Sequence, residues 1–153
     1  MQIYIGIEGF TLTSGFILKE MSICFTNREF RHLLFQQPSN LKLSPRDIFT
    51  IRYATQHINR LSFTDGDVPY MCIPDILERY KDSTIFTYGD CALNFLQRYL
   101  QTSTIINIKE YRFKMPSALP KPSCFRNHTP RNCSLAKALQ IRTFVESIST
   151  LNI

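Results

Sequence analysis

The segment TIFTYGDCALNFLQRYLQTSTIINI, residues 84–108, holds two short uncharged runs on either side of an amphipathic stretch. The two runs, residues 84–88 and 104–108, have the β-branched and aromatic content of buried strands. A helix is predicted between them after Gly89, because apolar residues there recur at helical spacing. These apolar positions are Ala92, Leu93, Phe95, Leu96 and Leu100. Short uncharged strands followed by helices are typical of parallel βα units, so the segment predicts two parallel strands with a covering helix.

Three further strands are predicted upstream of this segment. Residues 2–8 alternate in polarity and end at Gly9, as a strand would. Residues 16–25 follow a Ser14-Gly15 turn and form a second strand, and residues 30–36 form a third. Three strands joined by short turns favour an antiparallel meander.

The helices complete the predicted order of elements. The tetrapeptide SPRD, residues 44–47, supplies a capping hydroxyl, a first-turn proline and an acid, and predicts a helix over residues 45–57. A short helix is expected to end near Tyr80, and the last helix runs from Ser134 to about Ser147. We therefore predict an α/β domain with a mixed sheet of about five strands, three antiparallel and two parallel, flanked by helices. This order is the one expected of a ribonuclease H-like sheet, although order alone leaves other α/β sheets open.

Composition narrows the class of protein. The 153 residues are 44% apolar, 20% charged and 12% aromatic, which argues against disorder and predicts a single domain over residues 1–153. The five cysteines are an odd number, and no leader-like segment precedes them, so we expect reduced thiols in the cytosol or nucleus. The longest apolar runs are far shorter than the roughly 20 residues of a membrane span, so no membrane partner is expected.

The net charge of +6 is unevenly distributed along the chain. Residues 1–80 hold 8 basic and 8 acidic side chains, whereas residues 81–153 hold 10 basic and 4 acidic ones. Eight cations follow one another between residues 109 and 142 against the single acid Glu110, namely Lys109, Arg112, Lys114, Lys121, Arg126, Arg131, Lys137 and Arg142. Such a cluster favours an anionic partner, of which nucleic acid is the commonest, and the first six are the candidate RNA contacts. The alternative is a solvated basic face without a specific ligand.

A metal-ligand pattern lies inside this basic region. Cys124, His128 and Cys133 are spaced C-x3-H-x4-C in a proline-rich loop, where little hydrophobic packing is available to hold the chain. Two thiolates and an imidazole at this spacing can converge on a tetrahedral Zn²⁺ ion, although two incidental thiols and a surface histidine would give the same pattern. A fourth ligand would come from elsewhere, and the candidates are Glu20, Cys24, Cys72 and Cys91.

Glu20 is unusual among these candidates because it lies within an apolar strand, LKEMSIC. A buried glutamate needs a partner and a metal ion would supply one, whereas a glutamate on the polar face of the strand would point to solvent. The cysteines at positions 24, 72 and 91 have apolar neighbours and are expected to be small core residues.

Several of these motifs resemble a known family. The motifs are YIGIEGF (4–10) with KEMSIC (19–24), the YGD turn (88–90), and C-x3-H-x4-C-S-L-A-K (124–137). They resemble the DEDDh-type exonuclease domain of arenavirus nucleoproteins and the Maelstrom domain of the piRNA pathway. The resemblance implies a ribonuclease H-like fold with a structural Glu-Cys-His-Cys zinc site. The corresponding ligands here are Glu20, Cys124, His128 and Cys133.

The catalytic positions of the family are largely replaced in this chain. The first-strand Asp-x-Glu pair reads Gly6-Ile7-Glu8, so its aspartate is missing. Asn132 stands where the resemblance places the general-base histidine, and Lys137 where it places the last acid. Asp90 is present, but the family acid falls one or two positions later. Only vestigial Glu8 and Asp90 remain to bind the two cations of the family reaction, so the resemblance implies a pseudo-nuclease rather than an enzyme.

Three functions are compatible with these observations. The first is a catalytically degenerate module that binds single-stranded RNA, which the Maelstrom resemblance would place in an RNA-silencing pathway of the piRNA type. Aromatic residues interleave with the cations and could stack bases, namely Tyr111, Phe113 and Phe125. The second is a protein-interaction scaffold that uses apolar residues of the first half, namely Phe16, Phe25, Phe30, Leu33, Leu34 and Phe35. The third is a residual metal-dependent ribonuclease.

Overall fold

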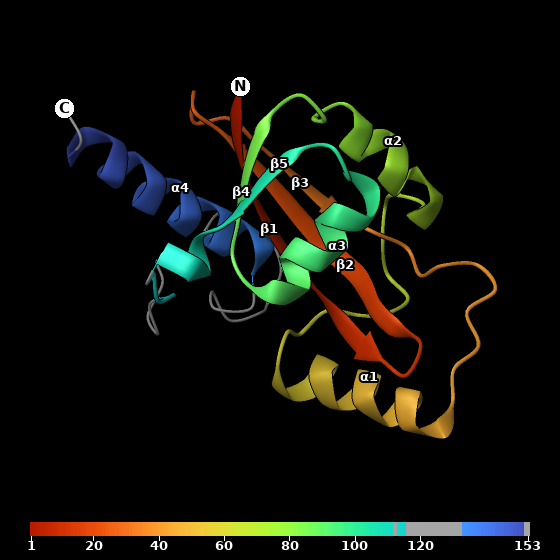
Figure 1. The fold of residues 1–153 in the computed structure, drawn as a ribbon. Helices are drawn as coiled ribbons and strands as arrows, with labels where there is room; N and C mark the ends of the chain where they lie inside the picture. The colour runs from red at the N-terminus through yellow and green to blue at the C-terminus, as the bar shows by residue number, and fades with distance from the viewer. Residues whose placement is uncertain (112, 116–132, 152–153) are drawn as a thin grey trace.

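The computed structural model describes residues 1–111, 113–115 and 133–151, and these form a mixed five-stranded sheet with helices on both faces (Figure 1). The strands are β1 (Gln2–Leu12), β2 (Gly15–Phe25), β3 (Phe30–Leu34), β4 (Thr84–Thr87) and β5 (Thr104–Asn107). Their order in the sheet is β3-β2-β1-β4-β5. Neighbouring strands are antiparallel from β3 to β1 and parallel from β1 to β5. The predicted fold class, with three antiparallel and two parallel strands, is therefore confirmed.

The helices follow the predicted order, and local signals account for their starts. They are α1 (Pro45–His57), η1 (Tyr70–Cys72), α2 (Ile73–Glu78), α3 (Asp90–Tyr99), η2 (Ile108–Tyr111) and α4 (Ser134–Leu151). The predicted bounds of α1 are confirmed, because the Ser44 hydroxyl accepts the Asp47 amide and the Asp47 carboxylate accepts the Ser44 amide. The last helix is longer than predicted and continues to Leu151.

The first strand does not end at Gly9, so that prediction was wrong. β1 continues to Leu12 across an irregularity in register between Glu8 and Gly9. A Cβ atom at Gly9 would lie 2.1 Å from the carbonyl oxygen of Ile17 on β2. Gly9 therefore marks a close approach of two backbones inside the hairpin rather than the end of a strand.

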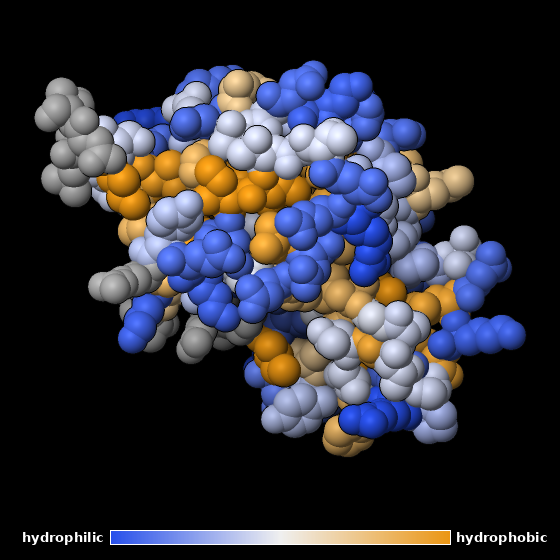
Figure 2. Space-filling view, viewed as in Figure 1, coloured by the Kyte–Doolittle hydropathy of each residue, from blue (hydrophilic) through white to orange (hydrophobic). Residues whose placement is uncertain are grey.

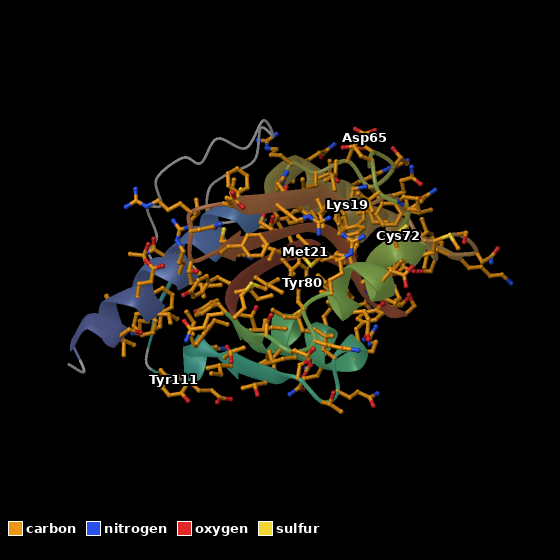
Figure 3. The ribbon with its side chains drawn as sticks, turned by 90° about the horizontal axis from the view of Figure 1, so that it is seen from above. Lys19, Met21, Asp65, Cys72, Tyr80 and Tyr111 are labelled. Atoms are coloured by element: carbon orange, nitrogen blue, oxygen red, sulfur yellow. The ribbon has the colours of Figure 1, made fainter. Side chains whose placement is uncertain are left out.

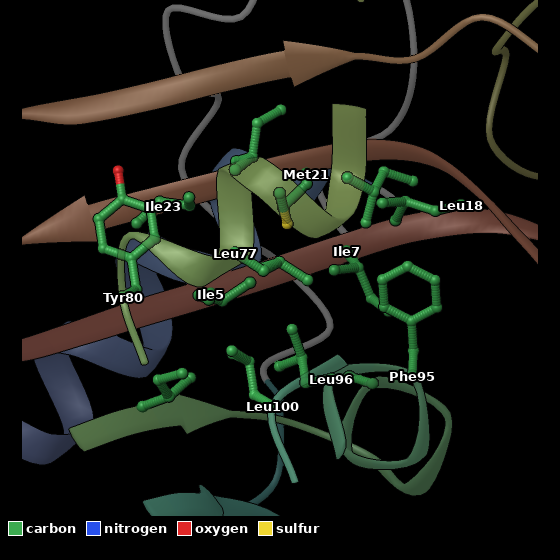
Figure 4. Packing of buried hydrophobic residues seen from close by; sticks show 14 of the residues in the cluster. Ile5, Ile7, Leu18, Met21, Ile23, Leu77, Tyr80, Phe95, Leu96 and Leu100 are labelled. Atoms are coloured by element: carbon green, nitrogen blue, oxygen red, sulfur yellow. The ribbon is translucent and has the colours of Figure 1, made fainter. Parts of the chain in front are cut away.

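One face of the sheet is covered by α2 and α3. Ile3, Ile5 and Ile7 of β1 point to this side and pack with residues of α2 and α3, as Figure 4 shows for Ile5 and Ile7. The partners from the two helices include Leu77, Phe95 and Leu96, which are at most 1% exposed. This alternation leaves the intervening residues of β1 and β2 to face the other side of the sheet.

The opposite face is covered by α4 (Figure 1). Tyr4 of β1 and Cys24 of β2 pack there against α4, where Ala138 and Ile141 are fully buried. α4 is the longest helix of the described residues. Neither α4 nor any other helix in the described part of the chain combines the length and apolar character of a membrane span.

A third apolar cluster joins α1 to the far end of the β1–β2 hairpin. Ile51 and Ala54 of α1 pack in it with Phe10 and Leu61. The loop after α1 is tied to the sheet by Lys19, a side chain on β2 that is only 1% exposed. Its ammonium group donates to three backbone carbonyls, those of Phe35 (2.7 Å), Phe63 (3.0 Å) and Asp65. Figure 3 shows Lys19 beside the loop that carries Asp65.

Candidate functional site

The candidate site lies on the face of the sheet under the first turn of α4. Glu8 of β1 stands opposite Glu20 of β2, and Gly6 stands opposite Ser22. Glu20 is fully buried and Glu8 is 9% exposed. The side chain of Glu20 therefore does not point to solvent, and two buried carboxylates lie next to each other across the strands.

The start of α4 supplies partners for both carboxylates. The Lys137 ammonium group forms an ion pair with Glu8 and lies 3.3 Å from the carbonyl oxygen of Ile7. The Ser134 amide donates to Oε1 of Glu20 at 2.6 Å, so Glu20 accepts one of the free N–H groups at the helix start. The hydroxyls of Ser134 and Ser22 are hydrogen-bonded at 2.7 Å. The helix thus begins directly on this pair of glutamates.

The helix also approaches the sheet so closely that position 6 has no room for a side chain. A Cβ atom at Gly6 would lie 2.1 Å from the carbonyl oxygen of Ser134, 2.9 Å from the amide nitrogen of Ala138 and 3.1 Å from Cβ of Lys137. The first two of these are backbone atoms, which cannot rotate away. An aspartate at position 6, where the resemblance places a catalytic acid, would require α4 to move.

Burial dominates the electrostatics of Glu8. Desolvation raises the pKa of the Glu8 carboxyl, Lys137 opposes that increase, and the neighbouring Glu20 adds to it. The Lys137 ammonium group favours the charged form of the Glu8 carboxylate against the cost of its burial. That cation belongs to the protein and leaves Glu8 a poor ligand for a second one.

A cavity of about 240 Å³ opens beside Glu8 and Lys137. From the start of α3 it is lined by Cys91 and Ala92. Cys91 is exposed and Cys72 half-buried, so only Cys24 of the three cysteines expected in the core lies fully within it. Partial desolvation raises the pKa of the Cys91 thiol, which disfavours the nucleophilic thiolate.

Asp90 is not among the residues that line this cavity. Its carboxylate accepts a hydrogen bond from the Asn107 side chain at 3.2 Å and lies 3.8 Å from the Lys109 ammonium group. The structure therefore does not pair Glu8 and Asp90, the two acids that the resemblance suggested, around this cavity. Sequence reasoning missed the role of Asn107, a buried residue at the end of β5 that also accepts the Gly89 amide.

Of the four expected zinc ligands, Glu20 and Cys133 are described, while Cys124 and His128 lie outside the described residues. Cys133 is 1% exposed, and the peptide that follows it donates to Glu20, so the two residues lie close together at the start of α4. His32 of β3, which the sequence did not suggest, places Nε2 3.2 Å from Oε2 of Glu20. Within residues 1–111, 113–115 and 133–151, no three His, Cys, Asp or Glu side chains are arranged to hold a metal ion.

The candidate RNA contacts are described only in part. Lys109 and Lys114 are exposed, whereas Arg112, Lys121, Arg126 and Arg131 lie outside the described residues. Tyr111 is 62% exposed and lies at the periphery of the molecule (Figure 3). Phe113 instead packs against Tyr88 and Phe144, with ring centroids 5.7 and 4.5 Å apart, so it belongs to the α4 cluster rather than to a base-stacking surface.

Most of the apolar residues that were expected to form a surface in the first half of the chain are not exposed. Phe35 and Leu34 are buried, and Phe16, Phe25 and Leu33 pack against the core. Of that set only Phe30 is largely exposed. Other large apolar residues of the first half are exposed, at Ile48, Phe49, Tyr53, Ile58 and Met71.

Comparisons with protein-family models, with curated proteins and with solved structures give no match to this chain.

Proposed function

We propose that this domain is a catalytically inactive, exonuclease-like module that binds single-stranded RNA. The observation that carries the first part is the ion pair between Glu8 and Lys137. Two-metal hydrolysis needs several carboxylates free to hold two divalent cations, and here a lysine neutralises Glu8 from within the site. The lack of space at Gly6 points the same way, because the missing aspartate could not be accommodated under α4.

The test of inactivity is an incubation of labelled single- and double-stranded RNA with the protein and Mn²⁺. We expect no cleavage above that of a buffer control. Cleavage by the wild type that disappears in Glu8→Ala would overturn the proposal, since it would show that Glu8 still holds a catalytic cation. Cleavage that Glu8→Ala leaves unchanged would be assigned to a contaminating nuclease and removed by further purification.

RNA binding is proposed from the charge of the segment between residues 109 and 131. The segment carries six cations against Glu110, and the exposed Tyr111 lies between Lys109 and Lys114 in the sequence. Cations can neutralise phosphates and an exposed ring can stack a base, which together favour a flexible single strand over a duplex.

A salt titration of binding to a fluorescent single-stranded RNA tests this part. We expect the combined replacement of Lys109, Lys114 and Arg126 by Gln to weaken binding and to lower the slope of log K against log salt by about 0.7 for each phosphate that is no longer neutralised. The matched control replaces by Gln three exposed cations outside this segment, Arg79 and Lys81 just after α2 and Arg98 near the end of α3. Equal effects of the two sets of substitutions, or no binding at about 50 mM salt, would refute the proposal.

We also propose a structural zinc ion held by Glu20, Cys124, His128 and Cys133. Two thiolates, an imidazole and a carboxylate suit Zn²⁺, and the burial of Glu20 next to Cys133 fits such a site. The ion would tie the proline-rich loop to the sheet. Elemental analysis of protein purified without added metal should give about one zinc per chain, with destabilisation on chelation. Metal-free protein of unchanged stability would exclude the site.

A protein-interaction scaffold is the second candidate, and one apolar groove favours it. The groove, of about 250 Å³, lies between α4 and the β4–β5 edge of the sheet. Figure 2 shows it as part of an apolar band across this face. Its lining includes Phe86, Ile106, Ile108, Phe144 and Ile148. A partner that stays bound to protein isolated from nuclease-treated cells, and that Ile148→Lys releases, would favour the scaffold over RNA binding.

A further inference from the structure

The solvent-facing side of α1 carries a row of three neighbouring aromatic rings. Phe49, Tyr53 and His57 are spaced four residues apart and therefore follow one another along the helix. The ring centroids of Phe49 and Tyr53 are 6.3 Å apart with planes at 21°, and those of Tyr53 and His57 are 4.9 Å apart at 44°. Phe49 is 69% and Tyr53 51% exposed.

These rings do not contribute to the core of the domain. Ile51 and Ala54 attach α1 to the β1–β2 hairpin from the opposite side of the helix, while Ile48 and Ile58 are 40% and 43% exposed. Exposing large aromatic rings to water costs free energy, and these rings add nothing to the core. Binding of a ligand to the rings would explain why they are exposed.

The charge around the rings is positive. The segment from residue 42 to residue 60 contains the exposed cations Lys42, Arg46, Arg52 and Arg60. Its single acid is Asp47, which is 2% exposed and whose carboxylate is occupied by hydrogen bonds from Thr13 and Ser44. The solvent side of α1 is therefore cationic, although the first half of the chain is neutral as a whole.

From this combination we propose that the outer face of α1 is a binding site for single-stranded nucleic acid. Unpaired bases stack on Phe49 and Tyr53, and the flanking arginines hold the phosphates. The site is sequence-tolerant, because every base has a face that can stack. A protein partner is less well matched, since Arg46 and Arg52 on α1 would each need an acid beside a small aromatic centre. This surface shares no residue with the segment between residues 109 and 131, so it extends the proposed function to a second region.

The chain contains no tryptophan, which allows a direct test of stacking. Tyr53→Trp places a single fluorophore in the row, and Phe30→Trp places one on β3 at a position of similar exposure (47%). Titration with a 12-nucleotide single-stranded RNA, and with DNA of the same sequence, should quench the tryptophan at position 53 and leave the one at position 30 unchanged. Equal response of the two fluorophores, or none, would overturn the proposal.

A second measurement compares affinities by fluorescence anisotropy with the labelled strand. The double substitution Phe49→Ala and Tyr53→Ala should weaken binding by about tenfold or more, while Phe30→Ala should not change it. If only the Lys109, Lys114 and Arg126 substitutions weaken binding, the α1 site is refuted and the proposed function stands. If only the α1 substitutions do, the α1 site stands and the segment between residues 109 and 131 is not the RNA contact. A change in sedimentation coefficient without a change in affinity would show that the rings serve self-association and would overturn the proposal.

Discussion

The close packing of α4 on Gly6 leads to a prediction about Gly6→Ala. Whether this substitution raises or lowers the stability of the domain tests that packing. The backbone of Gly6 has no positive φ, so alanine can adopt its conformation. Replacing glycine by alanine at such a position normally stabilises a protein by about 0.4–1 kcal/mol, because the unfolded chain loses conformational freedom. Here the new Cβ atom would lie 2.1 Å from the Ser134 carbonyl oxygen, whereas an ordinary contact is at least 3.4 Å. The first turn of α4 must therefore move by about 1.3 Å to relieve the clash.

The magnitude follows from what that movement breaks. The hydrogen bonds of Ser134 to Ser22 (2.7 Å) and to Glu20 (2.6 Å) would both be lost over such a distance. A neutral hydrogen bond contributes about 1 kcal/mol and a charged one about 1.5–3 kcal/mol, and overpacking adds about 1–3 kcal/mol. We expect Gly6→Ala to lower the free energy of unfolding by about 4 kcal/mol, a large part of the roughly 5–15 kcal/mol of a typical domain.

Urea denaturation followed by far-ultraviolet circular dichroism measures this change. Ser22→Ala is the matched control, because it removes the hydrogen bond to Ser134 without adding volume and should cost about 1 kcal/mol. A Gly6→Ala variant as stable as the wild type, or more stable, would refute the close packing of α4 on β1. It would also remove the argument that a catalytic aspartate has no room at position 6.

Three other predictions concern buried charges. Lys137→Met should destabilise the domain by about 2–3 kcal/mol at pH 7 because it leaves Glu8 buried without its cation, and adding Glu8→Gln should recover most of the loss in a double-mutant cycle. Lys19→Met should cost about 3 kcal/mol or more in urea denaturation, since three backbone carbonyls lose their donor, and a cost below 1 kcal/mol would contradict the tie between loop and sheet. The backbone amides of Thr13 and Ser44 lower the pKa of Asp47 from 3.8 to about 2, so its contribution to stability is present above pH 4 and is lost as the pH falls toward 2. Melting temperatures of Asp47→Asn should lack this part of the acid dependence, and parallel pH profiles of variant and wild type would contradict it.

Much of the fold could be predicted because its signals are local. The start of α1 depends on Ser44, Pro45 and Asp47, which are adjacent in the chain, and its predicted bounds are confirmed. The parallel strands β4 and β5 were found from short uncharged runs. The predicted end of the first strand at Gly9 was wrong. There the backbone of Ile17 on the neighbouring strand approaches Gly9 closely, and no local sequence pattern indicates that contact.

The candidate site depends on contacts between distant parts of the chain. Glu8 and Lys137 are 129 residues apart, and Glu20 and Ser134 are 114 apart, so no local pattern indicates either pair. Only the family resemblance had placed Glu8 and Lys137 at positions of one site. The same limit explains why Cys91 was expected in the core and lies exposed, and why the rings of α1 were not singled out. The residue types were visible, but their exposure depends on what packs against each face.

The sequence by itself determined the succession of strands and helices, the mixed sheet and the basic second half of the chain, because hydrophobic periodicity, capping and charge are properties of short segments. Only the tertiary structure decided that α4 begins on two buried glutamates, that position 6 has no space for an acid, and that α1 presents a row of aromatic rings to solvent. These features arise from the packing of one element on another, and such packing depends on residues that are far apart in the sequence, so no single segment predicts it.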